Sequence, residues 1–197
     1  MRINKYIAQS GLCSRRKADE LITNGNVRVN AAVLREPGYD VQEGDRVEVN
    51  GHLIAAEAGS VYVLINKPLG MVTTVSDDKE RLTVMEVVKD IDARLFPVGR
   101  LDLDTEGLLL ITNDGTLAHE LLSPKKHVTK TYFAKVQGRV TTEDVKRFSL
   151  GLDIGEEKPT LPATLVIEKS DDISEIRVSI TEGKYHQVKR MFEAVGK

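Results

Sequence analysis

The residues best able to carry out chemistry lie together in one stretch, residues 99–111. The polar part of this stretch precedes an apolar run and includes Arg100, Asp102, Asp104 and Thr105. The run has the length and content of a buried strand. A partly buried carboxylate beside a cation can serve as a nucleophile or a general base. By spacing alone, the better interpretation is a polar loop in which Asp104 or Thr105 caps a turn.

Composition limits the classes to which this chain of 197 residues can belong. A hydrophobic content of 41% is enough for a core. No apolar run approaches the ~18 residues of a membrane span, and the first residues lack the apolar region of a secretory signal. The single cysteine, Cys13, excludes an intrachain disulfide and fits a reducing cytoplasm. The spacing of the histidines does not match that of metal ligands. Because the net charge is −2, any contact with RNA must come from local basic patches and not from the charge of the whole protein.

Two short helices should open the chain. Ile3, Tyr6 and Ile7 have the spacing of one helix face. Ser14 is a suitable N-cap for a second helix, which should end at Gly25. Alternating valines then predict short strands around residues 27–29 and 47–49.

The rest of the chain predicts an α+β fold. Residues 55–60 are small and lack periodicity, which indicates an interdomain linker. Beyond them, strands and helices are expected in mixed order. The strands are expected at 61–65, 108–112, from 130, at 163–168 and at 176–181, and the helices at 83–88, 117–122, 141–150 and from 183.

The first 50 residues resemble the S4 RNA-binding domain, most clearly over 3–8, 14–18 and 25–30. The resemblance implies that Arg15, Arg16 and Lys17, here called the basic turn, contact RNA phosphates, because neutralised phosphates dominate such affinity. A solvated helix face is the alternative. Cations in a first turn oppose the helix dipole, so a compensating contact is expected. The sequence Asn30-Ala31-Ala32 lacks the glycine commoner after the asparagine, which predicts a looser turn.

The sequence G-R-L-D-x-D-T-x-G-L-L, beginning at Gly99, resembles the signature of RsuA-type pseudouridine synthases of the RsuA/RluA superfamily. Their catalytic aspartate directly follows Arg-Leu, which implies Asp102. Asp104 is the rival, and spacing alone cannot separate the two. If the segment is extended, Leu101 and Leu103 lie opposite both aspartates. Isomerisation of uridine to pseudouridine changes no oxidation state and adds no group, so the resemblance implies neither a cofactor nor a metal.

The resemblance also assigns roles to residues far from this stretch. Arg100 matches the arginine that fills the gap left by the flipped base. Tyr132, in Lys-Thr-Tyr, matches the tyrosine that stacks on uracil where C5 is deprotonated, although in isolation it would be an ordinary strand aromatic. Lys189, in His-Gln-Val-Lys, matches the basic residue that pairs with the catalytic aspartate and keeps it ionised. We therefore expect a buried ion pair between Lys189 and Asp102.

Three further residues complete the expected site. His186 is expected to position other groups, and Arg190 to contact an RNA phosphate. Lys67 belongs to Asn-Lys-Pro-x-Gly, which in the family packs beneath the active site. We group Lys67 with the RNA-binding residues and expect its role to be mainly structural.

The resemblance implies an S4-like domain over 1–54, a linker over 55–60 and a pseudouridine synthase domain over 61–197. The last should be built on a mainly antiparallel mixed sheet flanked by helices. Proteins of this family continue for several tens of residues, including one more strand, so the C-terminal part of this domain is expected to be missing.

The function implied is that of a cytoplasmic, monomeric synthase acting on ribosomal RNA. Residues 185–191 look most like the small-subunit branch, which modifies uridine 516 of 16S rRNA, so 16S is the first choice and 23S rRNA the second. A catalytically inert S4-type RNA-binding protein is the alternative class. The intact Arg100, Asp102, Tyr132 and Lys189 argue against it.

Overall fold

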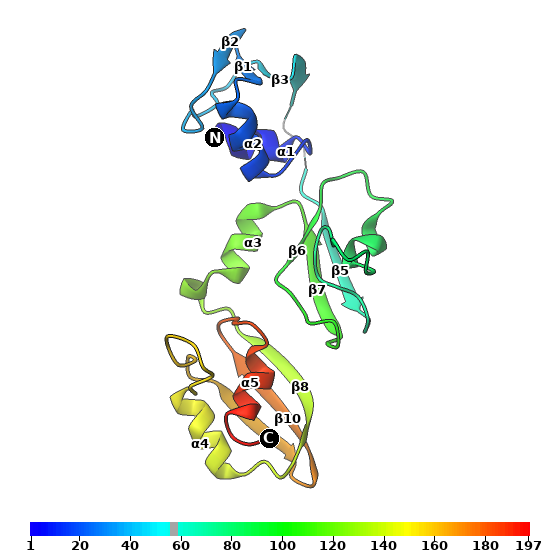
Figure 1. Cartoon of the computed structure of the whole chain (residues 1–197), viewed down its shortest axis with the longest axis vertical. Helices are drawn as coiled ribbons and strands as arrows, with labels where there is room; N and C mark the ends of the chain where they lie inside the picture. Colours follow the sequence, from blue (N-terminus) through cyan, green and yellow to red (C-terminus); the bar gives the residue numbers. More distant parts are fainter. Residues whose placement is uncertain (56–58) are drawn as a thin grey trace. The chain divides into compact units, whose positions relative to one another are not determined.

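The computed structural model describes residues 1–55 and 59–197 and contains two compact units, Met1–Asp114 and Gly115–Lys197 (Figure 1). In these residues the named strands form three sheets, and all neighbouring strands within a sheet are antiparallel. The α+β class is confirmed. No helix in the described ranges is long and apolar enough to cross a membrane. The linker expected over 55–60 includes residues 56–58, which lie outside the described residues.

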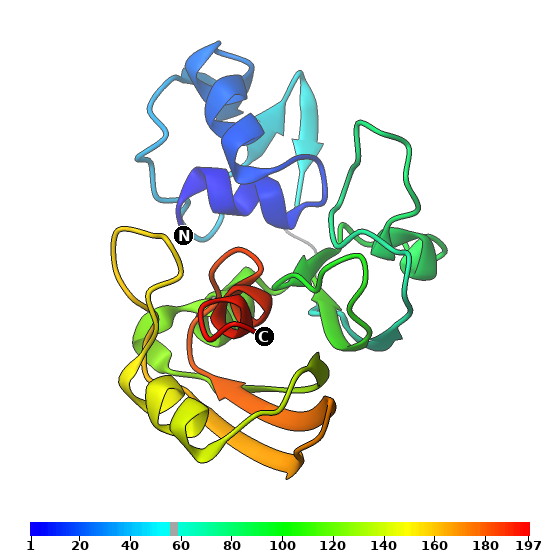
Figure 2. The same ribbon diagram turned by 60° about the horizontal axis from the view of Figure 1, so that its bottom comes forward.

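The N-terminal part of the first unit has two helices and a four-stranded sheet. Helices α1 (Ile3–Gln9) and α2 (Arg15–Thr23) lie against each other (Figure 2). The sheet has the order β2-β1-β3-β4, with bounds β1 (Val27–Val29), β2 (Ala32–Leu34), β3 (Val47–Val49) and β4 (His52–Ile54). Ile3, Ile7 and Ile22 are fully buried against the strand valines. The predicted helices are confirmed, and Ser14 caps α2 by accepting from the Lys17 amide at 3.2 Å.

The β1–β2 hairpin turns tightly at Asn30 and Ala31, whose φ angles are 51° and 70°. Val29 pairs with Ala32, so only these two residues connect the strands. The Asn30 side chain holds the turn by donating to Asp45 Oδ1 at 2.7 Å. The expectation of a looser turn is therefore wrong. Strand pairing forces both residues into the left-handed region, which costs a non-glycine residue about 1 kcal/mol.

The second sheet of the first unit has the order β5-β7-β6, with bounds β5 (Tyr62–Lys67), β6 (Phe96–Val98) and β7 (Gly107–Thr112). A 3₁₀ helix, η1 (Val84–Val88), buries Val84 and Val88 against Leu109 and Ile111. Because side chains alternate across a strand, Leu108 lies opposite this core and is 76% exposed. The run over 108–111 is thus buried on one face only, which corrects the expectation of a buried strand.

The second unit pairs a three-stranded sheet, β8-β10-β9, with helices. Its elements are α3 (Gly115–Leu122), the 3₁₀ helix η2 (Pro124–Lys126), β8 (Lys130–Gln137), α4 (Thr142–Leu150), β9 (Thr164–Lys169), β10 (Ile173–Ile180) and α5 (Gln187–Glu193). Phe148 of α4 and Phe192 of α5 meet at 5.0 Å between ring centroids. Both join Val136, Ile176 and Val178 in one core, so α4 and α5 cover the same sheet face.

Two local predictions for the second unit have different outcomes. Thr141 and Asp144 form the predicted capping box at the start of α4. The last helix, in contrast, begins at Gln187 and not at Gly183. His186 has φ 48° and ψ 37°, which keeps it outside the helix as the N-cap.

Candidate active site

The loop that carries Asp102 is a turn held by its own backbone. The Thr105 amide donates to the Asp102 carbonyl at 3.1 Å. Leu101 packs against the core formed by η1 and β7, whereas Leu103 is exposed. The segment is therefore not extended, and the two leucines do not share a side as expected. Asp102 is half-buried and Asp104 is exposed, so the structure distinguishes two carboxylates that spacing could not.

Lys67, the last residue of β5, supports this loop from inside the unit. Its side chain is 0% exposed, and the ammonium donates to the carbonyls of Thr105 at 2.7 Å and Pro68 at 3.0 Å. A fully buried ammonium presents no charge to an RNA phosphate, so grouping Lys67 with the RNA-binding residues is corrected. Both of its hydrogen bonds go to backbone, which is the geometry of a structural support.

Residues after Lys67 hold the same loop at two more points. The Gly70 amide donates to the Leu103 carbonyl at 2.8 Å, and the Thr73 hydroxyl donates to the Leu101 carbonyl at 2.7 Å. Thr73 is buried. No sequence signal indicated this threonine, because its partner lies 28 positions away. The backbone on both sides of Asp102 is thus attached to the segment that follows β5.

Lys67 also brings a positive charge to the two candidate carboxylates. Burial lowers the pKa of the Lys67 ammonium, while the charges of Asp102 and Asp104 oppose that shift. Sequence reasoning assigned the cation near Asp102 to Lys189 and missed Lys67 in this electrostatic role. The available signal was a lysine at the end of a strand, directly before a Pro-x-Gly turn.

Arg100 is exposed and follows Gly99, which has a φ of 83°. Its guanidinium is therefore in a position to meet a ligand from solvent, while Leu101 anchors the next residue in the core. Its role in filling the space of a flipped base stays a prediction.

Tyr132 and Lys189 belong to the second unit. Tyr132 lies on β8 opposite Val178 and packs, partly buried, against the unit's core. On α5, Val188 packs against that core and Lys189 is exposed. The burial expected for the Lys189 charge is not found, because the residue lies on the polar side of α5. Its pairing with Asp102 stays a prediction.

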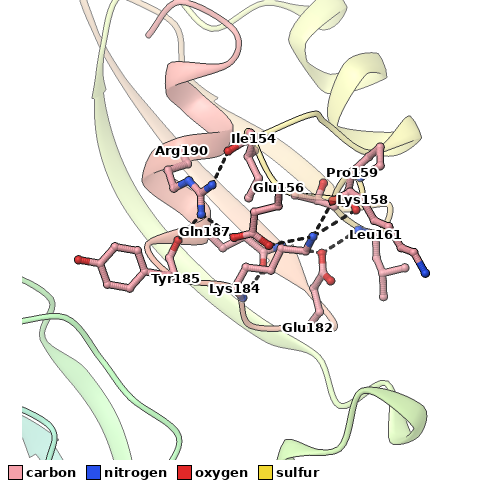
Figure 3. Close-up of polar contacts among 12 residues, drawn as sticks. Ile154, Glu156, Lys158, Pro159, Leu161, Glu182, Lys184, Tyr185, Gln187 and Arg190 are labelled. Atoms are coloured by element: carbon pink, nitrogen blue, oxygen red, sulfur yellow. Dashed lines mark hydrogen bonds and ion pairs between the residues drawn. The ribbon is translucent and has the colours of Figure 1, made fainter.

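The turn between β10 and α5 carries Tyr185 and His186, and the first part of α5 carries Arg190. Figure 3 shows Tyr185 and Arg190 near each other. The rings of Tyr185 and His186 stack, with centroids 3.8 Å apart and an angle of 18° between planes. Arg190 donates to Glu156 Oε1 at 2.7 Å, to the Tyr185 carbonyl at 3.0 Å and to the Ile154 carbonyl. These contacts occupy the guanidinium that was expected to meet a phosphate. No sequence signal indicated Glu156.

The basic turn lies at the start of α2. Arg15 and Arg16 are exposed, and Arg15 donates to Asn4 Oδ1 at 3.4 Å. Lys17 pairs with Glu20 at 2.7 Å, and this hydrogen bond raises the pKa of the Lys17 ammonium. The compensating contact expected for cations at a helix N-terminus is thus present. Arg15 and Arg16 stay exposed, and their contact with RNA phosphates stays a prediction.

The fold, the loop that carries Asp102 and the basic turn fit the class of RNA-modifying enzymes, and comparison with known proteins agrees. The family model for RNA pseudouridylate synthase matches residues 61–194, and that for the S4 domain matches residues 1–47. The chain therefore belongs to the RNA pseudouridylate synthase family.

Individual relatives span almost the whole chain. It is 45% identical to ribosomal large subunit pseudouridine synthase B of Bacillus subtilis, over 99% of this chain and 80% of that protein. Identity to ribosomal small subunit pseudouridine synthase A of Escherichia coli is 36%, over 100% of this chain and 84% of that protein. A crystal structure of a pseudouridylate synthase superposes with a TM-score of 0.68 at 34% identity, covering 100% of this chain and 84% of the other.

Proposed function

We propose that this enzyme isomerises one specific uridine of ribosomal RNA in the cytoplasm, and that the uridine lies in 23S rRNA. The observation that carries the choice of subunit is the identity of 45% to a large-subunit synthase, against 36% to a small-subunit synthase. Uridine 516 of 16S rRNA is the second candidate, favoured by the resemblance of residues 185–191 to the small-subunit branch.

The reaction breaks the bond from ribose C1′ to uracil N1, turns the base and rejoins it through C5. It needs a carboxylate near C1′ and C6, and Asp102 is the proposed group because it is half-buried on a loop held by the backbone. Attack on C1′ and removal of a ribose proton are both open to it. Because the atoms are rearranged without oxidation or group transfer, the proposed reaction uses only the residues of the protein.

The other proposed roles follow the same chemistry. The target must leave the RNA stack, at a cost of a few kcal/mol, and the exposed Arg100 would fill its place. Tyr132 would stack on the uracil ring where the C5 proton is lost, and Lys189 would stabilise the ionised Asp102. The S4 domain would hold the RNA backbone through the basic turn.

The experiment maps pseudouridine in 16S and 23S rRNA from cells that have or lack the gene. The deletion strain should lose one pseudouridine in 23S rRNA, and the wild-type gene should restore it, whereas the gene encoding Asp102→Asn should not. Loss of a 16S pseudouridine would move the target to the small subunit. If neither rRNA changes and the purified chain binds rRNA without isomerising it, the protein is a binding protein and the proposed reaction is refuted.

A further inference from the structure

A polar network in the second unit joins two segments far apart in the sequence. One is the loop over residues 152–161, between α4 and β9, here called the 152–161 loop. The other is the turn over residues 182–187, which carries Tyr185 and His186 at the start of α5. Figure 3 shows that Glu156 of the loop points toward Lys184 and Arg190. Glu156 and Arg190 are 34 positions apart, so the contact depends on the fold of the unit.

The loop has a defined shape of its own. Leu152 and Thr160 pair across its base, because the Thr160 amide donates to the Leu152 carbonyl at 2.8 Å and the Leu152 amide donates to the Thr160 hydroxyl at 3.0 Å. Gly151 has a φ of 85°, and a Cβ there would lie 2.3 Å from the Thr160 carbonyl oxygen. Leu152, Ile154 and Thr160 are buried. The base of the loop is therefore rigid, and its tip presents Glu156.

Glu156 binds two cations, Lys184 and Arg190, at once. Its two carboxylate oxygens lie 2.7 Å from Arg190 Nη1 and 3.3 Å from Lys184 Nζ. The hydrogen bond from Arg190 lowers the pKa of Glu156 against the opposing effect of burial, and Lys184 lowers it further. The carboxylate is therefore ionised at neutral pH, and both contacts are charge-assisted.

Backbone contacts extend the same connection. Lys184 also donates to the Lys158 carbonyl at 2.7 Å, and Arg190 donates to the Ile154 carbonyl. Glu182 accepts from the Leu161 amide at 2.7 Å and from Gln187 Nε2 at 2.9 Å. The turn is thus attached to the loop on both sides of His186.

His186 is the residue whose conformation most needs this support. It is a non-glycine residue at positive φ, which is costly and persists only where the surroundings hold it. Such strain is typical of functional segments, and the turn leads directly into the helix that carries Lys189.

We infer that Glu156 is a positioning residue for the isomerisation, which holds Lys184 and Arg190 so that the 182–190 segment keeps its catalytic arrangement. Arg190 then serves this network and does not contact an RNA phosphate. The inference rests on the proposed function, because it requires that the 182–190 segment contribute to the reaction.

The test compares Glu156→Gln with Glu157→Gln. The control is matched because Glu157 is the next residue, is exposed and makes no hydrogen bond or ion pair within the described chain. Glu156→Gln should lower kcat by about tenfold or more, since small misplacements of reacting groups are costly, and change KM for rRNA by less than about twofold. Glu157→Gln should match wild type, and Glu156→Asp, which keeps the charge, should recover most of kcat.

A second measurement does not depend on activity. Amide hydrogen exchange over residues 184–190 should become faster in Glu156→Gln and stay unchanged in Glu157→Gln. Unchanged exchange over these residues in Glu156→Gln would overturn the inference, whatever the activity of the wild-type enzyme. Inactivity of the wild-type enzyme on the RNA tested would refute only the proposed function. A rise in KM with kcat unchanged would overturn it in favour of RNA binding. A loss of kcat that only follows a lower Tm would show a merely structural role.

Discussion

The ammonium of Lys67 donates a hydrogen bond to the carbonyl of Thr105 at 2.7 Å, across 38 positions of sequence. This bond lies inside the first unit, directly beneath the loop that carries Asp102 and Asp104. A lysine is rarely buried completely unless its charge is satisfied, and here two carbonyls and two nearby carboxylates satisfy it. The relationship makes the position of the candidate catalytic loop depend on a residue at the end of another strand.

Asp102 and Asp104 should respond differently to the same substitution. Asp102→Asn is close to isosteric but removes the charge, so it should abolish isomerisation while leaving the fold and RNA affinity nearly intact. Asp104→Asn should keep most of the activity, because that side chain is exposed. Single-turnover assays with rRNA would measure both. An active Asp102 variant alongside a dead Asp104 variant would show that the assignment is reversed.

Replacing Lys67 should weaken both the fold and the reaction. Lys67→Met leaves the carbonyls of Thr105 and Pro68 without their donor, which should cost about 2–4 kcal/mol in unfolding free energy. The rate should fall as well, because the loop loses its support. Urea denaturation and the isomerisation assay would test this. The control is Lys79→Met at an exposed lysine, which should change stability by less than about 0.5 kcal/mol.

The stability difference between wild type and Lys67→Met should also depend on pH. Burial lowers the pKa of Lys67 below its ordinary value of 10.5. Between the folded and unfolded pKa values the unfolded chain binds more protons, so wild-type stability rises with pH in that window. The advantage of wild type over the variant should therefore grow as pH approaches 10.5. A difference that shrinks over this range would contradict burial as the main cause.

The basic turn should contribute binding and no chemistry. Replacing Arg15, Arg16 and Lys17 together by alanine should weaken RNA binding and flatten its salt dependence by about 0.7–0.9 in logarithmic slope for each phosphate that is no longer neutralised. Because Lys17 is paired with Glu20, the double variant of the two arginines should account for most of the change. Binding titrations over a range of salt concentrations would measure the slopes. If affinity and slope stay at wild-type values, the turn is ordinary solvated surface.

Ala31→Gly should stabilise the N-terminal sheet. Ala31 has a φ of 70°, and glycine reaches this region without the penalty of about 1 kcal/mol that other residues incur. Ala32→Gly is the matched control, because Ala32 is in β2 and has no such strain. It should destabilise by roughly 0.5–1 kcal/mol. Hydrogen exchange of the buried Val27 and Val29 amides would report both changes, and equal signs for the two variants would contradict the expectation.

Lys189 should act on the rate more than on the fold. The residue is exposed, so Lys189→Met should cost no more than about 1 kcal/mol in stability. If Lys189 pairs with Asp102, its loss should move the activity optimum to higher pH, because a carboxylate without a neighbouring cation ionises less readily. Lys189→Arg should keep the wild-type profile. Rate–pH profiles of wild type, Lys189→Met and Lys189→Arg would test this. An unshifted optimum in Lys189→Met would exclude an ion pair between Lys189 and Asp102.

Local patterns in the sequence were sufficient for most elements and for the family. Ser14 and the Thr141–Asp144 pair indicated two helix starts that the structure has, because a capping bond involves only neighbours along the chain. The stretch at Gly99 was sufficient for the family, because its glycines, charges and spacing all lie within a dozen residues. The assignment of Asp102 as the catalytic carboxylate rested on this resemblance alone, because spacing did not separate it from Asp104.

Other features depended on long-range contacts that only the tertiary structure decides. Leu108 is exposed because only one face of β7 packs against the core that η1 helps to form. A run of apolar residues in the sequence does not show which face of the strand is buried. The turn at Ala31 is tight because paired strands overrule the preference of alanine. The sequence did not show the charge of Lys67 beneath the Asp102 loop or the ion pairs of Glu156, since each residue has a partner more than 30 positions away. Their hydrogen bonds form only when the chain has brought distant strands and loops together.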